Sequence, residues 1–440
     1  MAHSNKSNIH LGSHGKAGAF SRSSTLSFDK NAADLSADHY WRAVGDWANS
    51  SKNDEGVPIY VHIPFSSTRC GQGTHVAEIT DSVPAVDDYL QLLDKEISTV
   101  TAKIGSGRKV SQLHVGGAAP NFLSNQQLIQ LTDTIDEHFN VAEEAERTIE
   151  INPYRASFAQ LGLLRGLGFT NLQFELRELL RGDSAGLDRP CSPDLLADVF
   201  ANARAVGFKT IAVDITYGSQ RRAEDDVLQE LECLLDLKPD RILCHAAQSS
   251  FAEKEAHDFD QASEGLSHAA KLAMFVSMVN VFEQRGYEWV GVSGFALPGD
   301  AWCDAQAEGR LYRNWIGYTT EPAFSVLGFG LGAVSELPGL ISQSHENLRS
   351  WSAAVAKGLP PIAKGVELSA LKSKERHLLT LLSANLNAQA PETMDLDIVS
   401  ELTESGVIEA DAGRVSLTPF GRAFFSQVNE WDRHHRAIVN

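Results

Sequence analysis

A regular alternation of short apolar runs with longer amphipathic segments, between residues 57 and 292, constrains the fold most strongly. The apolar runs are rich in β-branched and aromatic residues and predict strands over 57–63, 110–115, 147–151, 170–176, 209–215, 240–245 and 287–292. The amphipathic segments predict helices over 84–103, 124–138, 155–167, 192–206, 225–237 and 267–285. Ser124 and Ser192 are suitable amino-terminal caps for two of these helices.

Strand–helix alternation of this kind produces right-handed crossovers and a parallel sheet. About six such units are too few to close an eight-stranded barrel. The sequence therefore predicts an α/β fold with an open, partial (β/α)6 barrel. Functional side chains on such a scaffold are expected where the strands end, at one common mouth.

Composition shifts suggest the domain organisation. We expect a disordered arm rich in Ser, His, Asn and Gly over 1–35, a helical lead-in over 36–56 and the barrel over 57–292. A glycine-rich extension packed on the barrel follows over 293–358, up to the Gly-Leu-Pro-Pro stretch at 358–361. Helical periods at 369–385 and 396–405, and two short strands around residues 411–413, predict a winged-helix-like domain over 359–440.

Charge and cysteine content exclude several classes of function. The formal net charge of −19 argues against a general binder of nucleic acid or anionic membranes, because phosphate binding needs a basic face. No apolar run is long enough to predict a membrane span, and the amino terminus lacks the apolar core of a signal peptide. The five cysteines are scattered without a Cys-x-x-Cys pair, so we expect neither a disulfide framework nor a zinc ribbon, and a cytoplasmic location.

The loop after the first strand carries the most specific pattern in the chain, Y-V-H-I-P-F-S-S-T-R-C-G-Q-G over residues 60–73. This stretch resembles the cluster loop of the radical S-adenosylmethionine (SAM) enzymes. More narrowly, it resembles the oxygen-independent coproporphyrinogen III oxidases, whose pattern is Y-x-H-I-P-F-C-x3-C-x2-C. On that pattern the three cysteine positions are Ser66, Cys70 and Gly73. The resemblance implies an iron–sulfur loop in which two of the three thiolate ligands are replaced.

Other segments extend the resemblance to roughly residues 55–435. Residues 311–320, L-Y-R-N-W-I-G-Y-T-T, are similar to the oxidases' R-N-x-x-G-Y-T-T, and 327–333 are similar to L-G-x-G-x-S/G-A. Three segments depart from the family pattern: G-G-A-A-P at 116–120 replaces G-G-G-T-P, E-L-R at 175–177 replaces G-V-Q, and S-G-F-A at 293–296 replaces D-H-F-A. Strands and turns are kept, while groups that face the cofactor and the substrate are changed.

The resemblance implies a SAM site at the strand ends, with Tyr60, Gly116, Gly117, Glu150, Arg189 and Asp214 as cofactor-binding residues. In the family the glutamate meets the SAM amino group, the arginine lies near its carboxylate and the aspartate binds its ribose. Ala118 adds a methyl group to the glycine loop, and Glu175 adds a charge at the barrel mouth. We therefore expect weakened SAM binding.

The metal-binding hypothesis rests on Cys70. A [4Fe–4S] cluster is held by cysteine thiolates, so the loss at Ser66 and Gly73 disfavours a conventional cluster. Without it no electron reaches SAM, and we assign no catalytic residue. Cys70 with His62 and His75 could ligate haem iron or another metal, since thiolate and imidazole are usual axial ligands. Alternatively, Cys70 is a remnant of the lost site and His62 is structural.

Three hypotheses about function follow. The first is a non-catalytic binder of a tetrapyrrole, either porphyrin or haem, in which Arg313, Arg189 and Arg177 could meet propionates. The second is a working oxidase, which would convert two propionates to vinyls by oxidative decarboxylation, with Cys70 and ligands from elsewhere holding the cluster. The third is a protein-interaction scaffold that uses the carboxy-terminal domain, which is not notably basic and is better suited to a protein partner than to DNA.

Overall fold

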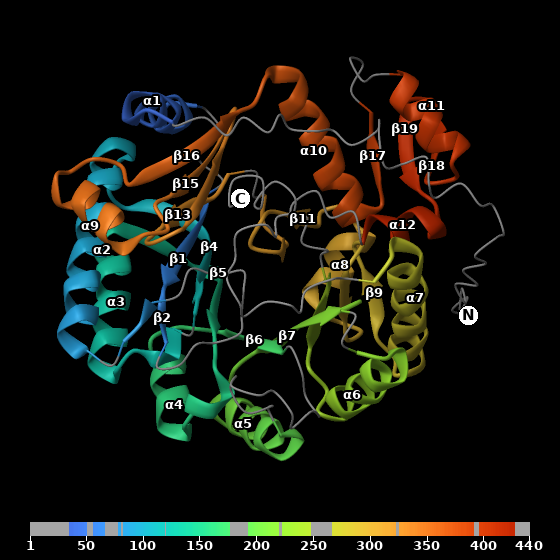
Figure 1. The fold of residues 1–440 in the computed structure, drawn as a ribbon, viewed down its shortest axis with the longest axis horizontal. Helices are drawn as coiled ribbons and strands as arrows, with labels where there is room; N and C mark the ends of the chain where they lie inside the picture. Colours follow the sequence, from blue (N-terminus) through green and yellow to red (C-terminus); the bar gives the residue numbers. More distant parts are fainter. Residues whose placement is uncertain are drawn as a thin grey trace.

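The core of the computed structural model is a curved nine-stranded sheet in the order β13-β1-β4-β5-β6-β7-β8-β10-β9 (Figure 1). The structure describes residues 35–50, 56–66, 78–80, 82–118, 120–176, 192–219, 222–247, 266–322, 325–390 and 396–426. The strands are β1 (Val57–Ile63), β4 (Arg108–Gly117), β5 (Phe139–Glu150), β6 (Asn171–Leu176), β7 (Thr210–Tyr217), β8 (Arg241–Ala246), β9 (Glu288–Val290), β10 (Gly294–Ala296) and β13 (Leu327–Phe329). Every pair from β13 to β8 is parallel, and β10 is antiparallel to both β8 and β9.

One helix follows each of the six strands β1, β4, β5, β6, β7 and β8 and covers the outer face of the sheet (Figure 1). These helices are α2 (Val83–Ile104), α3 (Asn125–His138), α4 (Phe158–Gly166), α5 (Pro193–Val206), α6 (Glu224–Asp236) and α7 (His268–Gln284). Serine side chains cap all of them except α6, and Ser124 forms a full capping box with Gln127. The predicted α/β class with a mostly parallel sheet is confirmed.

The segment after β9 contributes one strand at or next to each edge of the sheet, in addition to packing on it. β10 joins the β8 edge, and β13 joins the opposite edge through the register of Ile59 with Leu327. Between these edges lies a short hairpin, β11 (Tyr312–Arg313) and β12 (Tyr318–Thr319); Figure 1 shows β11 in the gap. The Trp315 ring packs edge-on against the Tyr60 ring at 4.6 Å, so the hairpin reaches across to β1.

Outside the main sheet, strand pairing continues across the predicted boundary near residue 358. A three-stranded sheet contains β14 (Val334–Leu337), β15 (Leu340–Ser344) and β16 (Ile362–Glu367). α1 (Ala37–Ala48) packs on β14 and β15, and α9 (Leu348–Ala356) packs on α2, whereas α8 (Ala301–Ala307) lies beside β9. Two short strands, β2 (Phe65–Ser66) and β3 (Glu78–Ile79), pair in parallel beside the end of β1, and 3-10 turns occupy Pro120–Phe122 and Pro153–Arg155.

The carboxy-terminal segment, called the carboxy-terminal module below, contains its own three-stranded sheet. Its elements are α10 (Ala370–Asn385), β17 (Asn387–Gln389), α11 (Leu396–Glu404), β18 (Ile408–Asp411), β19 (Arg414–Leu417) and α12 (Pro419–Phe425), with a sheet in the order β17-β19-β18. Arg422 of α12 donates to the Gly291 carbonyl at 2.7 Å and lies over the Trp289 ring at 3.9 Å, which attaches the module to the barrel. No helix among the described residues is long and apolar enough to cross a membrane.

A buried carboxyl group joins α2 to the turn after β13. The Glu96 side chain is 5% exposed, and its Oε2 accepts from the Gly330 backbone N–H at 2.9 Å and from Trp351 Nε1 at 3.2 Å. Burial raises the pKa of Glu96 to about 8, because both neighbours are neutral donors that only partly replace water around an ionised carboxylate.

We expect Glu96→Gln to make stability less dependent on pH. The folded state retains the Glu96 proton between the ordinary carboxyl pKa of 4.5 and about 8, whereas the unfolded chain loses it, so the free energy of unfolding falls as pH rises through this window. The fall is about 1.4 kcal/mol for each pH unit at most. Thermal unfolding should show the variant equal to or less stable than wild type at pH 5 and more stable at pH 9. The exposed Glu137→Gln is the matched control, and a difference that does not change with pH would contradict the prediction.

Candidate cofactor site at the strand ends

The structure brings together most of the residues that the sequence predicts to bind a cofactor. Gly116, Gly117 and Glu150 lie at the carboxyl ends of the parallel strands β4 and β5, and Tyr60 and Asp214 lie in the middle of the parallel strands β1 and β7. The predicted Arg189, together with Cys70 and Gly73, lies outside the described residues.

Glu150 is the centre of a preformed hydrogen-bond network. Its Oε1 lies 2.9 Å from His114 Nε2, and its Oε2 accepts from the Gly117 backbone N–H at 2.9 Å. A Cβ atom on Gly116 would lie 2.4 Å from Glu150 Oε1, so glycine at this position leaves room for the carboxylate. Both oxygens of Glu150 are therefore already engaged by protein groups.

Tyr60 contributes a neutral phenol to the same site. Its ring stacks on the His114 ring with centroids 5.6 Å apart, and its hydroxyl lies 3.1 Å from His62 Nδ1. Burial, followed by the negative charge of Glu150, raises the pKa of Tyr60 well above its ordinary value. The Tyr60 hydroxyl thus acts here as a hydrogen-bonding group, and its contact supports a structural role for His62.

The glycine loop after β4 is fixed by backbone contacts. Gly117 has φ +120°, and a Cβ atom there would lie 2.5 Å from the Ile63 carbonyl oxygen. The Ala118 backbone N–H donates to that same carbonyl at 3.0 Å. The loop therefore approaches the end of β1 closely although it contains alanine in place of a third glycine.

Among the described site residues, Asp214 has a carboxylate oxygen that accepts no hydrogen bond. Its Oδ2 accepts from Gln173 Nε2 at 2.8 Å and lies 3.5 Å from His245 Nε2. Its Oδ1 is buried and has no hydrogen-bond partner in the described part of the chain. Glu175 lies two residues after Gln173 on β6, so its carboxylate is on the same inner face of the barrel. The described part of the site therefore holds three carboxylates, those of Glu150, Glu175 and Asp214.

Sequence reasoning missed His114, Gln173 and His245 as members of this site. A signal was present, because polar residues alternate with apolar ones along otherwise apolar strands, as in Gln112-Leu113-His114 of β4. Alternate residues of a strand share one face, so these side chains point into the barrel with the predicted residues.

Of the three positions that the sequence aligns with cluster-binding cysteines, the structure describes Ser66 alone. Ser66 is 6% exposed on β2, and its carbonyl accepts from the Thr80 backbone N–H at 3.1 Å. The described cysteines are Cys233 on α6, Cys244 on β8 and Cys303 on α8. Cys244 is packed among the apolar side chains of α6 and α7, where burial raises the pKa of its thiol. No group of three potential metal-ligating side chains occurs within the described ranges.

The structure places Arg313 on β11 of the hairpin. Arg313 is 5% exposed, and its guanidinium lies over the Tyr318 ring, 5.0 Å from the centroid. The adjacent Asn314 donates to Gln112 Oε1 at 3.0 Å, two residues before His114. The hairpin therefore forms part of the floor beneath the Glu150 network. Arg177 lies outside the described residues.

The comparisons with known proteins agree on one family. No protein-family model matches the chain. It is 30% identical over 393 residues to the oxygen-independent coproporphyrinogen III oxidase of Synechocystis sp., covering 84% of each chain. It is 27% identical over 389 residues to that of Escherichia coli, again covering 84% of each.

The fold agrees with the sequence comparison. The solved coproporphyrinogen III oxidase HemN from Escherichia coli, described as a radical SAM enzyme, superposes with a TM-score of 0.76. The match covers 89% of this chain and 93% of that chain at 24% identity. By its similarity over most of its length, the chain belongs to the oxygen-independent coproporphyrinogen III oxidase family.

Proposed function

We propose that this chain is a family member without the [4Fe–4S] cluster and without radical chemistry, whose barrel binds a tetrapyrrole, porphyrin or haem. The observation that carries the proposal is the donor set of the cluster loop. Serine replaces the first thiolate at Ser66, glycine removes the third at Gly73, and Cys70 alone remains. Because three thiolates hold such a cluster in the family, one cysteine gives too few ligands.

We further propose that Tyr60, Gly116, Gly117, Glu150, Arg189 and Asp214 remain as a weakened SAM-binding set. When bound, SAM would present a positively charged amino group, which suits a site that holds three carboxylates. The buried Oδ1 of Asp214 could accept a ribose hydroxyl. Against tight binding, both Glu150 oxygens already accept hydrogen bonds from His114 and Gly117, so a ligand amino group must compete with them.

The tetrapyrrole part of the proposal is supported by what the chain retains. The relatives that it matches along most of their length are named for a reaction on coproporphyrinogen III. The R-N-W-I-G-Y-T-T segment at 313–320 is kept and packs directly beneath the Tyr60 side chain. A barrel that keeps this floor and loses its electron-transfer ligands is suited to binding rather than turnover. In this view the carboxy-terminal module is a surface for a protein partner.

Iron analysis followed by tetrapyrrole titration tests the proposal. After anaerobic reconstitution, we expect the full chain to contain well under about one iron per chain and no broad thiolate–iron absorption. Added haem or coproporphyrin should then show a saturable Soret shift. If the chain contains about three to four irons, and if Cys70→Ala loses them while Cys303→Ala keeps them, the chain holds a cluster. This result would overturn the proposal and favour the working oxidase. Absence of both iron and a Soret shift would contradict tetrapyrrole binding and favour the scaffold hypothesis.

A further inference from the structure

Arg313 is a buried cation without a counter-charge in the described part of the chain. It is 5% exposed, and no described carboxylate lies within 4.0 Å of its guanidinium. Its Nη1 is fully enclosed and has no hydrogen-bond partner. Arginine stays protonated in proteins, so burial cannot be relieved by losing the proton. An uncompensated buried charge is strongly destabilising, which implies that a partner is missing.

Two more residues that contact Tyr318 each carry an unsatisfied polar atom. Ser293 Oγ and Trp302 Nε1 are buried without hydrogen-bond partners. The Ser293 backbone N–H donates to the Tyr318 hydroxyl at 3.2 Å, and the Trp302 and Tyr318 rings meet edge-on at 5.4 Å. A guanidinium and an indole N–H can only donate, so the partner that both lack is an acceptor.

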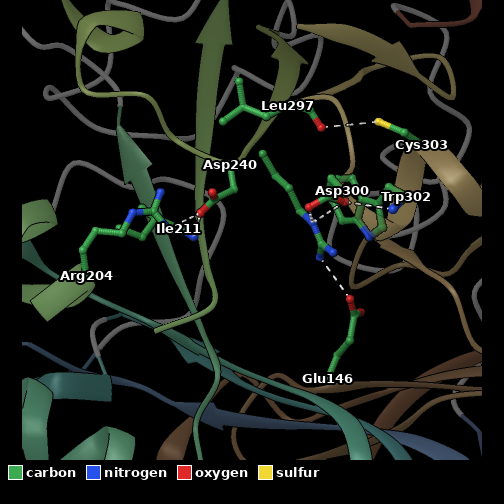
Figure 2. Close-up of polar contacts among 9 residues, drawn as sticks. Glu146, Arg204, Ile211, Asp240, Leu297, Asp300, Trp302 and Cys303 are labelled. Atoms are coloured by element: carbon green, nitrogen blue, oxygen red, sulfur yellow. Dashed lines mark hydrogen bonds and ion pairs between the residues drawn. The ribbon is translucent and has the colours of Figure 1, made fainter. Parts of the chain in front are cut away.

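The other described arginines with similar burial are paired. Arg222 contacts Glu230, and Arg241 lies between Glu146 and Asp300. Figure 2 shows the carboxylates of Glu146 and Asp300 with dashed lines to the guanidinium between them. Trp302 lies against Arg241 with the guanidinium carbon 4.2 Å from the ring centroid, so the paired and the unpaired arginine lie over two aromatic rings, Trp302 and Tyr318, that contact each other. The local charge balance therefore lacks one negative charge at Arg313.

We propose that a small monovalent anion, of the halide or formate class, binds Arg313 in the floor of the barrel, with Ser293 and Trp302 as neighbouring donors. The ligand is small because the three side chains are between 0% and 5% exposed. Bound there, the anion links the β11–β12 hairpin to β10 and α8 and so stabilises the element that lies in the gap of the open barrel. The inference goes beyond the proposed function, because its test requires no tetrapyrrole.

Bromide is the probe for this site, because it scatters anomalously. Crystals of the full chain grown in sodium bromide should show an anomalous peak in contact with Arg313 Nη1. At constant ionic strength, replacing sodium gluconate by bromide up to about 200 mM should raise the melting temperature by at least about 3 °C. An ordered water or a protein carboxylate at Arg313, or an unchanged melting temperature, would overturn the proposal.

Two variants separate a site from a general salt effect. Arg313→Met removes the charge and should abolish both the peak and the bromide dependence, whereas the exposed Arg310→Met should keep both.

Ser293→Asp supplies an internal carboxylate to the cluster and should make stability insensitive to bromide. Ser342→Asp is its matched control, because that buried serine also has an unsatisfied Oγ but lies on β15 without a described arginine contact. If Arg313→Met fails to fold, the wild-type measurements still decide. A bromide response that persists in folded Arg313→Met would contradict the assignment.

Discussion

The double variant Ser66→Cys, Gly73→Cys is expected to take up iron and sulfide that the wild-type chain does not. It restores the three thiolates of the family pattern around Cys70, and a [4Fe–4S] cluster needs cysteine ligands at these positions. After anaerobic reconstitution, we expect a rise from well under one to about three or four irons per chain, with the broad visible absorption of a thiolate-bound cluster.

The surrounding backbone favours this gain. Ser66 lies on β2, directly after β1 and Pro64, and its carbonyl bond to Thr80 involves no side-chain atom. Serine and cysteine are nearly the same size, so the substitution should not disturb the strand. The single variants Ser66→Cys and Gly73→Cys are the controls, since each still lacks one thiolate and should remain far below the double variant. Cys70→Ala in the double background should remove the iron again. A double variant that folds and stays free of iron would mean that another feature of the loop prevents assembly.

Local patterns along the sequence were sufficient to predict the barrel. The predicted helix over 192–206 corresponds to α5 (Pro193–Val206), and the predicted strand over 209–215 corresponds to β7 (Thr210–Tyr217). These elements are long, strongly periodic and bounded by caps or glycine, which are signals that a single segment carries by itself. The same reasoning placed Glu150 and Asp214 at one side of the same sheet, on β5 and β7, because parallel strands end at the same edge.

Features that depend on contacts between distant segments could not be predicted in this way. β13 and β10 contain only three residues each, and they are strands because β1 and β8 offer them free edges. The bond between His114 and Glu150 depends on the register of β4 with β5, which neither segment encodes alone. A short run without periodicity does not indicate which strand it will pair with. A polar side chain on a strand does not indicate which charged side chain it will contact.

The buried ion pairs of Arg241 belong to the same class of distant contact, and removing them should have the largest effect on stability. Arg241 Nε donates to both oxygens of Asp300 at 3.0 and 2.9 Å, and Nη1 donates to Glu146 Oε1 at 3.0 Å (Figure 2). The arginine side chain is 7% exposed, and the two carboxylates are 16% and 10% exposed. Arg241→Met leaves both carboxylates buried without their cation, so we expect the free energy of unfolding to fall by about 3–5 kcal/mol.

Arg285 provides a matched control, because it also bridges two carboxylates, Glu232 and Asp236, but on the surface. Its side chain is 31% exposed and its partners are 46% and 71% exposed, so water already solvates all three groups. Arg285→Met should cost less than about 1 kcal/mol. Denaturant unfolding of both variants measures the difference between their free energies of unfolding. Adding Glu146→Gln and Asp300→Asn to Arg241→Met should recover part of the lost free energy of unfolding, since the buried charges are then removed. Equal losses of unfolding free energy in the two arginine variants would show that the barrel interior is hydrated around Arg241. The burial of Arg241, Glu146 and Asp300 would then not determine their contribution to stability.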